Sequence, residues 1–212
     1  MSGTEVAAGV ETVDFGGLQI SFDARVLRPR DWTTAQSWWA AALVRDLPAG
    51  DVLELCSGAG QIGLLAVAES DRHLVCVDVS PVAASYALLN AGAAGFSERV
   101  SVRTGLISEV LPRGEQFPLI IADPPWVRRS ETGRFPEDPL LAIDGGDDGM
   151  DVVHECLRAI SSHLAPRGVA LIQLGTHEQA EAVAGLLDGS GLIAGEVRTY
   201  GDRGVLLRID HA

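Results

Sequence analysis

Short apolar runs alternate with amphipathic segments along most of the chain, and each kind predicts a different element. Apolar runs of about four to eight residues bounded by turn residues are typical of buried strands. Such strands are predicted at residues 17–22, 51–55, 74–77, 99–103, 117–122 and 168–174. Helices are predicted at residues 33–47 behind an N-cap at Thr33, from the end of a glycine-rich turn at Gly63 to about Glu69, from Pro81 onward, at about 150–164 and at 177–187. Strands that alternate with helices indicate a parallel sheet covered by helices on both faces.

The C-terminal part of the chain changes to two consecutive strands. Residues 194–199 and 204–209 are joined by a Tyr-Gly-Asp-Arg turn, which predicts an antiparallel hairpin. The predicted fold is therefore of the α/β class, doubly wound and mostly parallel, with an antiparallel C-terminal hairpin. Residues 15–212 are expected to form a single domain, because 212 residues with 47% hydrophobic content suit one well-filled core. Residues 1–14 are expected to be a flexible N-terminus, and residues 127–148 a long loop.

The acidic composition narrows the class of partner. A net charge of −13 disfavours sequence-independent binding of nucleic acid, which depends on a basic surface. No apolar run approaches the ~20 residues that cross a bilayer, and the first residues lack a secretory signal. The chain is therefore expected to be cytoplasmic, without a membrane partner. The three cysteines have no Cys-x-x-Cys spacing and the five histidines no metal-ligand spacing, so no metal site is predicted.

A glycine-rich turn follows the strand predicted at residues 51–55. Residues 58–63 fit the pattern G-x-G-x-x-G between a strand and a helix, and Asp78 lies twenty residues beyond Gly58 at the end of the next strand. This is the spacing of a dinucleotide-binding fingerprint, in which the acid binds ribose hydroxyls. The same geometry serves any ligand that contains adenosine. The turn alone therefore leaves a nicotinamide-dependent oxidoreductase open as one interpretation.

Two further features favour a different chemistry. Glu54 lies in the strand before the turn, where an acid has no task in pyrophosphate binding but suits a ligand ammonium group. The tetrapeptide Asp-Pro-Pro-Trp at residues 123–126 directly follows an apolar strand. The prolines lack N–H donors and fix the backbone, so Asp123 and a carbonyl can accept both N–H bonds of an amide or amino group, with Trp126 stacked on its flat face. A proline-stiffened loop that merely ends a strand is the alternative.

These segments are expected to meet at one place. Ligands of open α/β sheets bind beyond the carboxyl ends of the strands. Asp78, the glycine turn and Asp123 all lie at such ends, so the sequence predicts that they line one crevice. Core packing without a ligand is the remaining interpretation, and it would place three carboxylates at strand ends by accident.

The chain resembles the class I S-adenosylmethionine-dependent methyltransferases, and within them the HemK-type protein-glutamine N-methyltransferases. Residues 52–63 are similar to that family's cofactor loop, and residues 77–81 to its ribose-binding segment. Residues 140–151, with the sequence Leu-Leu-Ala-Ile-Asp-Gly-Gly-Asp-Asp-Gly-Met-Asp, resemble the stretch downstream of its Pro-Pro motif and are the most family-specific match. The resemblance implies a Rossmann-like sheet of seven strands, and S-adenosyl-L-methionine as the cofactor.

The resemblance also assigns roles to individual positions. It implies that the cofactor is bound by Glu54, Cys56, Gly58, Gly60, Asp78, Val79, Leu106 and Asp123. It implies that the acceptor is held by Asp123, Pro124, Pro125 and Trp126. The implied activity is N-methylation of a planar amide or amino nitrogen, in the first place the side-chain amide of a protein glutamine.

Departures from the family pattern leave the acceptor open. Asp123 and Trp126 stand where the family usually has asparagine and tyrosine, and this version is reminiscent of methyltransferases that act on adenine amino groups. Too few residues precede Phe15 for the helical domain with which bacterial members dock release factors. The alternatives are therefore an adenine-N6 or small-molecule N-methyltransferase and, in another class, an NAD-dependent oxidoreductase or an inactive cofactor-binding protein. A small partner protein is not indicated.

Overall fold

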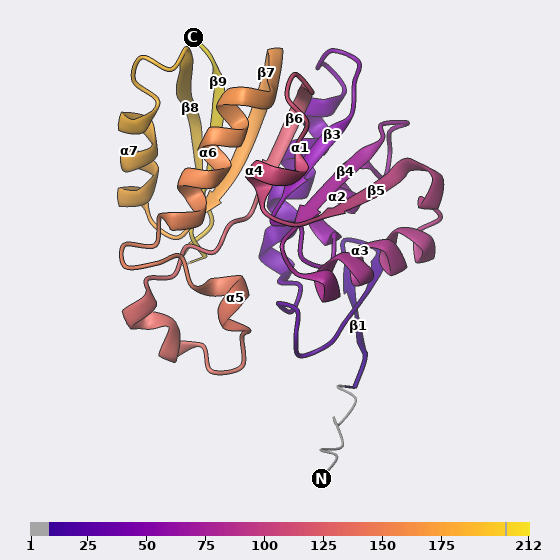
Figure 1. Ribbon diagram of the computed structural model, residues 1–212. Helices are drawn as coiled ribbons and strands as arrows, with labels where there is room; N and C mark the ends of the chain where they lie inside the picture. The colour runs from indigo at the N-terminus through magenta and orange to yellow at the C-terminus, as the bar shows by residue number, and fades with distance from the viewer. Residues whose placement is uncertain (1–8, 202) are drawn as a thin grey trace.

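Seven strands among the described residues, 9–201 and 203–212, form one sheet in the computed structural model (Figure 1). They are β3 (Val52–Leu55), β4 (Leu74–Asp78), β5 (Val100–Thr104), β6 (Phe117–Ala122), β7 (Leu164–Leu174), β8 (Leu192–Thr199) and β9 (Val205–His211). Their order across the sheet is β5-β4-β3-β6-β7-β9-β8. The first five strands in this order pair in parallel, whereas β9 is antiparallel to both β7 and β8. The predicted doubly wound sheet with a C-terminal hairpin is therefore confirmed.

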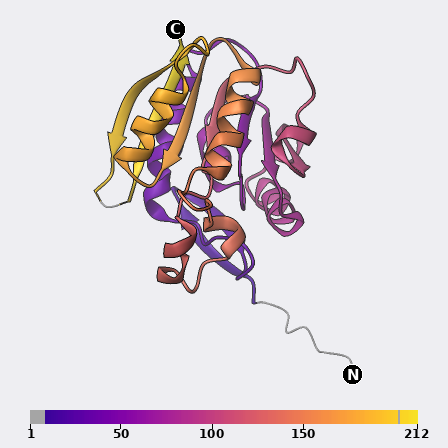
Figure 2. The same ribbon diagram turned by 60° about the vertical axis from the view of Figure 1, so that its left-hand side comes forward.

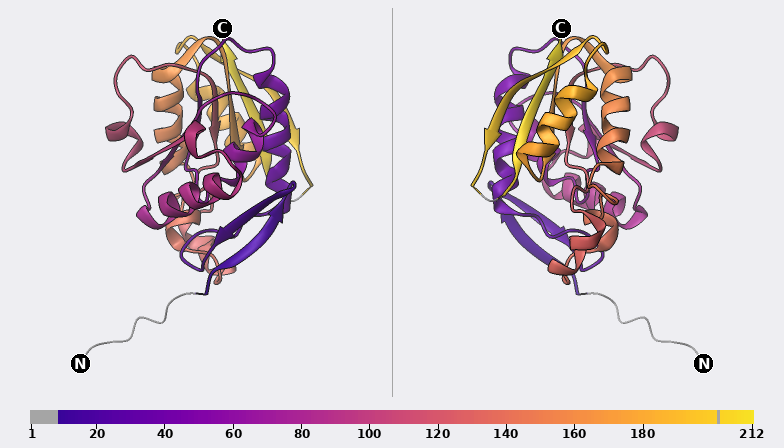
Figure 3. Two further views of the ribbon diagram at one scale, coloured as in Figure 1. Left: turned by 90° about the vertical axis from the view of Figure 1, so that its right-hand side faces the viewer. Right: turned by 90° about the vertical axis from the view of Figure 1, so that its left-hand side faces the viewer.

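Helices cover both faces of this sheet (Figure 3). One face carries α1 (Thr34–Val44), α2 (Gln61–Val67) and α3 (Pro81–Ala93), and the other carries α4 (Ile107–Val110), α6 (Asp151–His163) and α7 (His177–Leu186). Successive side chains of a strand point to opposite faces. Leu119 and Ile121 of β6 accordingly pack with the first helix layer, and Ile120 and Ala122 with the second. Burial on both faces explains why this strand is a continuous apolar run.

The N-terminal region differs from the prediction of a flexible segment over residues 1–14. Residues 1–8 lie outside the described part of the chain, but β1 (Glu11–Phe15) pairs antiparallel with β2 (Leu18–Phe22). Gly16 and Gly17 both have positive φ, as a two-residue hairpin turn requires. Phe15 is buried in the core under α1–α3, which stabilises the hairpin. The Gly-Gly pair was the sequence signal for this element.

Several element boundaries also differ. Thr33 is at the predicted N-cap position of α1, but its side chain does not cap the helix, because its hydroxyl donates to the carbonyl of Arg30 at 2.8 Å and a 3₁₀ turn, η1 (Asp31–Thr33), precedes α1. The long loop at 127–148 contains η3 (Arg129–Arg134) and α5 (Leu140–Ile143), and a further 3₁₀ turn, η2 (Ser97–Arg99), precedes β5. Within the described part of the chain, no helix has the length and apolar character needed to cross a membrane.

Two peripheral segments gather at one end of the sheet. The β1–β2 hairpin and the η3–α5 segment both lie there, and Figures 1 and 2 show them at the lower end. The residues just beyond β2 and those around α5 line a common cavity with the carboxyl ends of β4 and β6. The fold therefore places both segments over the edge where an open α/β sheet binds its ligands.

Candidate active site

A cavity of about 590 Å³ opens at the carboxyl ends of the parallel strands. Cavities that bind small ligands commonly measure about 300–1,000 Å³. The residues that line it include Cys56, Gly58 and Gln61 of the glycine turn, Asp78, Val79 and Ser80 after β4, Leu106, Ile107 and Ser108 after β5, and Asp123 and Pro125 after β6. Asp78, the glycine turn and Asp123 thus line one cavity, as the sequence predicts.

The carboxylate of Asp78 is fixed against the glycine turn by backbone hydrogen bonds. Its Oδ2 accepts from the N–H of Gly58 at 2.8 Å, and its Oδ1 accepts from the N–H of Ser80 at 2.8 Å. The turn reverses sharply, with positive φ at Cys56, Gly58 and Gly60. Burial raises the pKa of Asp78, and the two N–H groups oppose this shift. Each carboxylate oxygen keeps a further lone pair, so Asp78 is available to accept hydrogen bonds from ligand hydroxyls.

Two exposed apolar side chains lie on the same wall of the cavity as Asp78. Val79 is 47% exposed and Leu106 is 54% exposed, and both line the cavity. Exposed apolar surface inside a cavity favours contact with an apolar or aromatic part of a ligand. A carboxylate flanked by such surface is suited to a nucleoside, which joins hydroxyls to a flat ring.

Glu54 lies beneath the glycine turn and does not line the cavity. Its Oε1 accepts from the N–H of Gly63 at 2.9 Å, and its Oε2 accepts from the thiol of Cys76 at 3.4 Å. A Cβ at Gly63 would lie 2.4 Å from Oε2 of Glu54, so glycine is required for this close approach. Burial raises the pKa of Glu54 to about 8, so the group is mostly neutral at pH 7. Its contacts brace the turn from below.

Asp123 directly follows β6 and faces the same cavity from the opposite side of β3. Its N–H points to the carbonyl of Leu55 at 3.4 Å. Burial raises the pKa of Asp123 to about 7, so this carboxyl group changes charge near neutral pH. Pro125 lines the cavity as well, whereas Pro124 is buried beside it. A ligand group bound in this part of the cavity would lie beside the carboxyl oxygens of Asp123 and beside a loop whose two prolines carry no N–H donor.

Trp126 lies differently from its expected stacking position. A Cβ at Gly175 would lie 2.3 Å from Cε3 of Trp126, so the indole ring packs directly on that glycine after β7. Trp126 is not among the residues that line the cavity. The ring therefore anchors the loop to the end of β7 in this structure.

Two segments that are distant in the sequence form the outer walls of the cavity. Arg25, Val26 and Leu27 form one wall, and Pro139, Leu140, Leu141, Ala142 and Asp144 form the other. An ion pair between Arg30 and Asp138 at 2.5 Å connects the two segments. No periodicity or motif links positions 108 residues apart, so this contact was not predicted from the sequence.

The Asp-Gly-Gly stretch at residues 144–146 holds the loop that follows Asp123. The N–H of Gly145 donates to the carbonyl of Val127 at 2.8 Å, and the N–H of Val127 donates to the carbonyl of Ile143 at 3.0 Å. The guanidinium of Arg129 binds Asp144 at 3.0 Å and Asp147 at 3.1 Å. The backbone N–H of Gly146 and the Arg129 side chain lower the pKa of Asp144. This stretch therefore supports the site from outside, and Asp144 also reaches the cavity.

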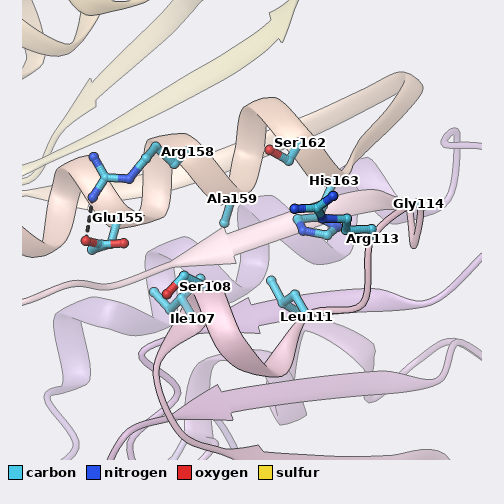
Figure 4. Close-up of a pocket in the computed structure, with 10 residues that line it drawn as sticks. All are labelled: Ile107, Ser108, Leu111, Arg113, Gly114, Glu155, Arg158, Ala159, Ser162 and His163. Atoms are coloured by element: carbon cyan, nitrogen blue, oxygen red, sulfur yellow. Dashed lines mark ion pairs between the residues drawn. The ribbon is translucent and has the colours of Figure 1, made fainter.

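A second cavity of about 400 Å³ lies between α4 and α6 (Figure 4). Three of its polar side chains have protein partners, because Arg158 pairs with Glu155 and Nδ1 of His163 lies 2.7 Å from the carbonyl of Glu115. Ile107 and Leu111 form an apolar floor. No strand-end carboxylate lines this second cavity. The larger cavity is therefore the candidate active site.

Comparison with known proteins agrees with this geometry. The model of the family described as "Methyltransferase small domain" matches residues 39–136. The "Release factor glutamine methyltransferase" of Clostridium acetobutylicum is 28% identical over 195 residues, which cover 89% of this chain and 68% of the relative. The "Ribosomal protein uL3 glutamine methyltransferase" of Bordetella pertussis is 33% identical over 170 residues, which cover 77% of this chain and 56% of the relative. The chain thus spans 68% and 56% of the length of these two relatives.

Solved structures share the fold at low sequence identity. The hMettl16 catalytic domain in complex with MAT2A 3'UTR hairpin 1 superposes with a TM-score of 0.71 at 15% identity, over 94% of this chain and 75% of that chain. The ribosomal protein L11 methylase from Lactobacillus delbrueckii subsp. bulgaricus gives a TM-score of 0.64 at 16% identity, over 89% of this chain and 83% of that chain. At these identities the likeness shows the fold alone.

The strand order, the glycine turn with its acid after β4 and the sequence relatives agree on one family. S-adenosyl-L-methionine is the methyl donor of that family, so the dehydrogenase interpretation of the glycine turn does not hold. The chain is an S-adenosylmethionine-dependent methyltransferase with the class I fold, and it is related in sequence to protein glutamine methyltransferases.

Proposed function

We propose that this enzyme methylates the side-chain amide nitrogen of a glutamine in a protein substrate. The observation that carries the proposal is that Asp123, after β6, shares one cavity with Asp78 and the glycine turn. A methyl donor on one wall would therefore face a hydrogen-bond acceptor on the other. Relatives of this chain that bear the names of glutamine methyltransferases support an amide as the acceptor.

The cofactor wall suits S-adenosylmethionine. Asp78 would accept hydrogen bonds from the ribose hydroxyls, and Val79 and Leu106 would contact the adenine ring. The backbone of the glycine turn, at Cys56, Gly58 and Gly60, would approach the methionine part, because positive φ at these residues brings the turn close to the cavity. When bound, the cofactor supplies an electrophilic methyl group on a sulfonium. Glu54 would act from beneath by fixing the turn through Gly63.

On the acceptor wall, Asp123 and the carbonyl of Pro124 would orient the amide nitrogen for attack on the methyl group. An amide nitrogen is a poor nucleophile because its lone pair is delocalised into the carbonyl. Asp123 and the carbonyl of Pro124 would accept its two N–H bonds, which favours a pyramidal nitrogen with the lone pair turned away from both acceptors. Asp123, in its charged form, would also stabilise the positive charge that develops on nitrogen and would then take the proton that the methylated nitrogen releases. Alignment of this kind can supply about 7–11 kcal/mol of the barrier.

A protein substrate agrees with the charge of the chain. The net charge of −13 disfavours a nucleic-acid substrate, whose binding relies on basic residues. One observation favours the adenine amino group as a second candidate, namely the aspartate and tryptophan of the Asp-Pro-Pro-Trp loop in place of asparagine and tyrosine. A carboxylate accepts hydrogen bonds from an amino group as well as from an amide.

The test is transfer of a labelled methyl group from S-adenosylmethionine. Purified release factors, ribosomal protein uL3 and an adenine-containing RNA are incubated separately with the wild-type enzyme, and the modified residue is identified by mass spectrometry. Label on a protein glutamine is the expected result. Label on RNA adenine alone would overturn the proposal in favour of the second candidate, and absence of label from all of these substrates would contradict both.

A further inference from the structure

The acceptor loop, residues 123–126, has few backbone hydrogen bonds of its own. Pro124 and Pro125 carry no N–H, and the bond that leads into the loop, from the N–H of Asp123 to the carbonyl of Leu55, is long at 3.4 Å. Buried backbone carbonyls nevertheless need donors. The loop must therefore be held by groups from elsewhere in the chain.

A buried glutamine from α7 binds the end of this loop. Nε2 of Gln179 donates to the carbonyl of Trp126 at 3.1 Å and to the carbonyl of Gly149 at 3.3 Å. Its Oε1 accepts from the N–H of Gly175 at 2.8 Å. One side-chain amide thus connects the acceptor loop, the segment before α6 and the end of β7. Both ends of the amide are engaged, which fixes its orientation because carbonyls accept only from the NH₂ group.

A second buried glutamine holds the beginning of the loop in the same manner. Nε2 of Gln36, in α1, donates to the carbonyl of Ala122 at 3.0 Å and to the carbonyl of Leu171 in β7 at 3.2 Å. Gln36 is 0% exposed and Gln179 is 7% exposed. Each amide therefore links one end of the loop to β7, so the two together set the position of the loop relative to the sheet.

Glycines allow the loop to lie close enough for these bonds. A Cβ at Gly149 would lie 2.4 Å from the carbonyl oxygen of Trp126, and the Trp126 ring packs on Gly175. The carbonyl of Trp126 is thus enclosed between Gly149 and Gln179. A displacement of Gln179 would be transmitted to the loop, because no free space separates them.

We propose that Gln179 is a positioning residue for methyl transfer, which sets the acceptor loop and with it Asp123 and the Pro124 carbonyl. The inference rests on the proposed function of that loop. Gln179 does not line the cavity, so it acts through the loop and leaves the cofactor wall unchanged. A misplacement of about 1 Å can cost about 10²-fold in rate. Loss of the Gln179 donor is therefore expected to lower kcat by about 10- to 100-fold with unaltered cofactor affinity.

The test uses Gln179→Met, which removes both halves of the amide, and Gln179→Glu, which keeps an acceptor for the Gly175 N–H but removes the donor. The matched control is Gln173→Met. Gln173 in β7 is 5% exposed, and its Nε2 donates to the carbonyls of Leu174 at 3.1 Å and Arg203 at 3.3 Å, away from the acceptor loop. Hydrogen–deuterium exchange at residues 126–129 reports the loop without reference to activity.

Faster exchange at residues 126–129 in both Gln179 variants, but not in Gln173→Met, is the expected result. Labelled-methyl transfer to a release factor or uL3 is expected to show a lower kcat in the same two variants, with the calorimetric Kd for S-adenosylmethionine unchanged. Unaltered exchange in Gln179→Met, or an equal fall in kcat in Gln173→Met, would overturn the positioning role. If wild-type enzyme methylates neither protein, the proposed function fails, and the exchange measurement still decides whether Gln179 holds the loop.

Discussion

The two walls of the cavity are built by different means. On the cofactor wall, backbone N–H groups of the glycine turn and of the start of α3 bind the Asp78 carboxylate, and all partners come from consecutive elements. On the acceptor wall, the loop after β6 is held by side-chain amides from α1 and α7, and the outer segments are joined by Arg30 and Asp138, 108 residues apart. The first wall tolerates little change because its geometry is made by the backbone. The acceptor wall is held by side chains, so substitution of those side chains can change which methyl acceptor it binds.

The largest expected effect breaks the acceptor wall alone. Asp123→Ala removes the carboxyl group that accepts the N–H of the substrate, and kcat for labelled-methyl transfer is expected to fall by about 10²–10³-fold, as for loss of other preorganised groups in a water-excluded site. Glu155→Ala is the matched control, since Glu155 also lines the cavity but its carboxylate pairs with Arg158 within α6. Wild-type turnover in Asp123→Ala would remove Asp123 from the mechanism.

A smaller effect breaks the cofactor wall. Asp78→Ala is expected to weaken S-adenosylmethionine binding by about 10- to 100-fold, because hydrogen bonds to charged groups contribute about 1.5–3 kcal/mol and 1.4 kcal/mol corresponds to tenfold. Part of the loss arises from the turn, whose Gly58 and Ser80 N–H groups lose their acceptor. Isothermal titration calorimetry measures this affinity, and an unchanged Kd would refute the role of Asp78.

The pH dependence of transfer sharpens the comparison. Burial raises the pKa of Asp123 to about 7, and the charged form is the one proposed to accept N–H bonds. The value of kcat/KM is therefore expected to rise with pH and to level off above about pH 7, falling about tenfold per unit below it. Asp123→Asn keeps an acceptor oxygen that does not titrate, so kcat/KM of this variant should not fall below pH 7. The same fall in Asp123→Asn would assign the titration to another group.

The smallest expected effect concerns the support beneath the cofactor wall. Burial raises the folded-state pKa of Glu54 to about 8, so the folded protein holds a proton that the unfolded chain releases above its ordinary pKa. The stability that Glu54 contributes is therefore present at low pH and lost as pH rises through about 8. Glu54→Gln should remove this loss and melt a few degrees higher than wild type at pH 8, since 1 kcal/mol corresponds to about 2–4 °C. Equal melting shifts at pH 5 and pH 8 would contradict this.

The difference between the two walls also explains which features could be predicted from the sequence. The sheet, its two helix layers, the C-terminal hairpin and the meeting of Asp78, the glycine turn and Asp123 follow from apolar periodicity and from the rule that ligands bind at the carboxyl ends of strands. These features depend on local patterns. The β1–β2 hairpin escaped prediction because polar Thr12 and Asp14 mask its strand character, although Gly16 and Gly17 marked the turn.

Contacts between segments that are distant in the sequence could not be predicted from local sequence patterns. Nothing in the neighbours of Gln36 or Gln179 distinguishes a buried amide that binds the acceptor loop from a solvated glutamine on a helix. Glu54 was expected to meet a ligand, yet it binds Gly63 and Cys76 below the turn, because strand alternation points its side chain under the first helix layer. Trp126 was expected to stack on the acceptor, but Gly175 offers its ring a closer surface. Each of these placements depends on tertiary packing.

The central claim is that the two walls act separately, and titration of Asp123→Ala with S-adenosylmethionine tests it most directly. Wild-type enzyme is titrated in parallel under the same conditions. The account predicts the same Kd in both proteins, because the cofactor is held by Asp78 and the glycine turn. Loss of cofactor binding in a folded Asp123→Ala protein would contradict it and would make Asp123 part of the cofactor wall.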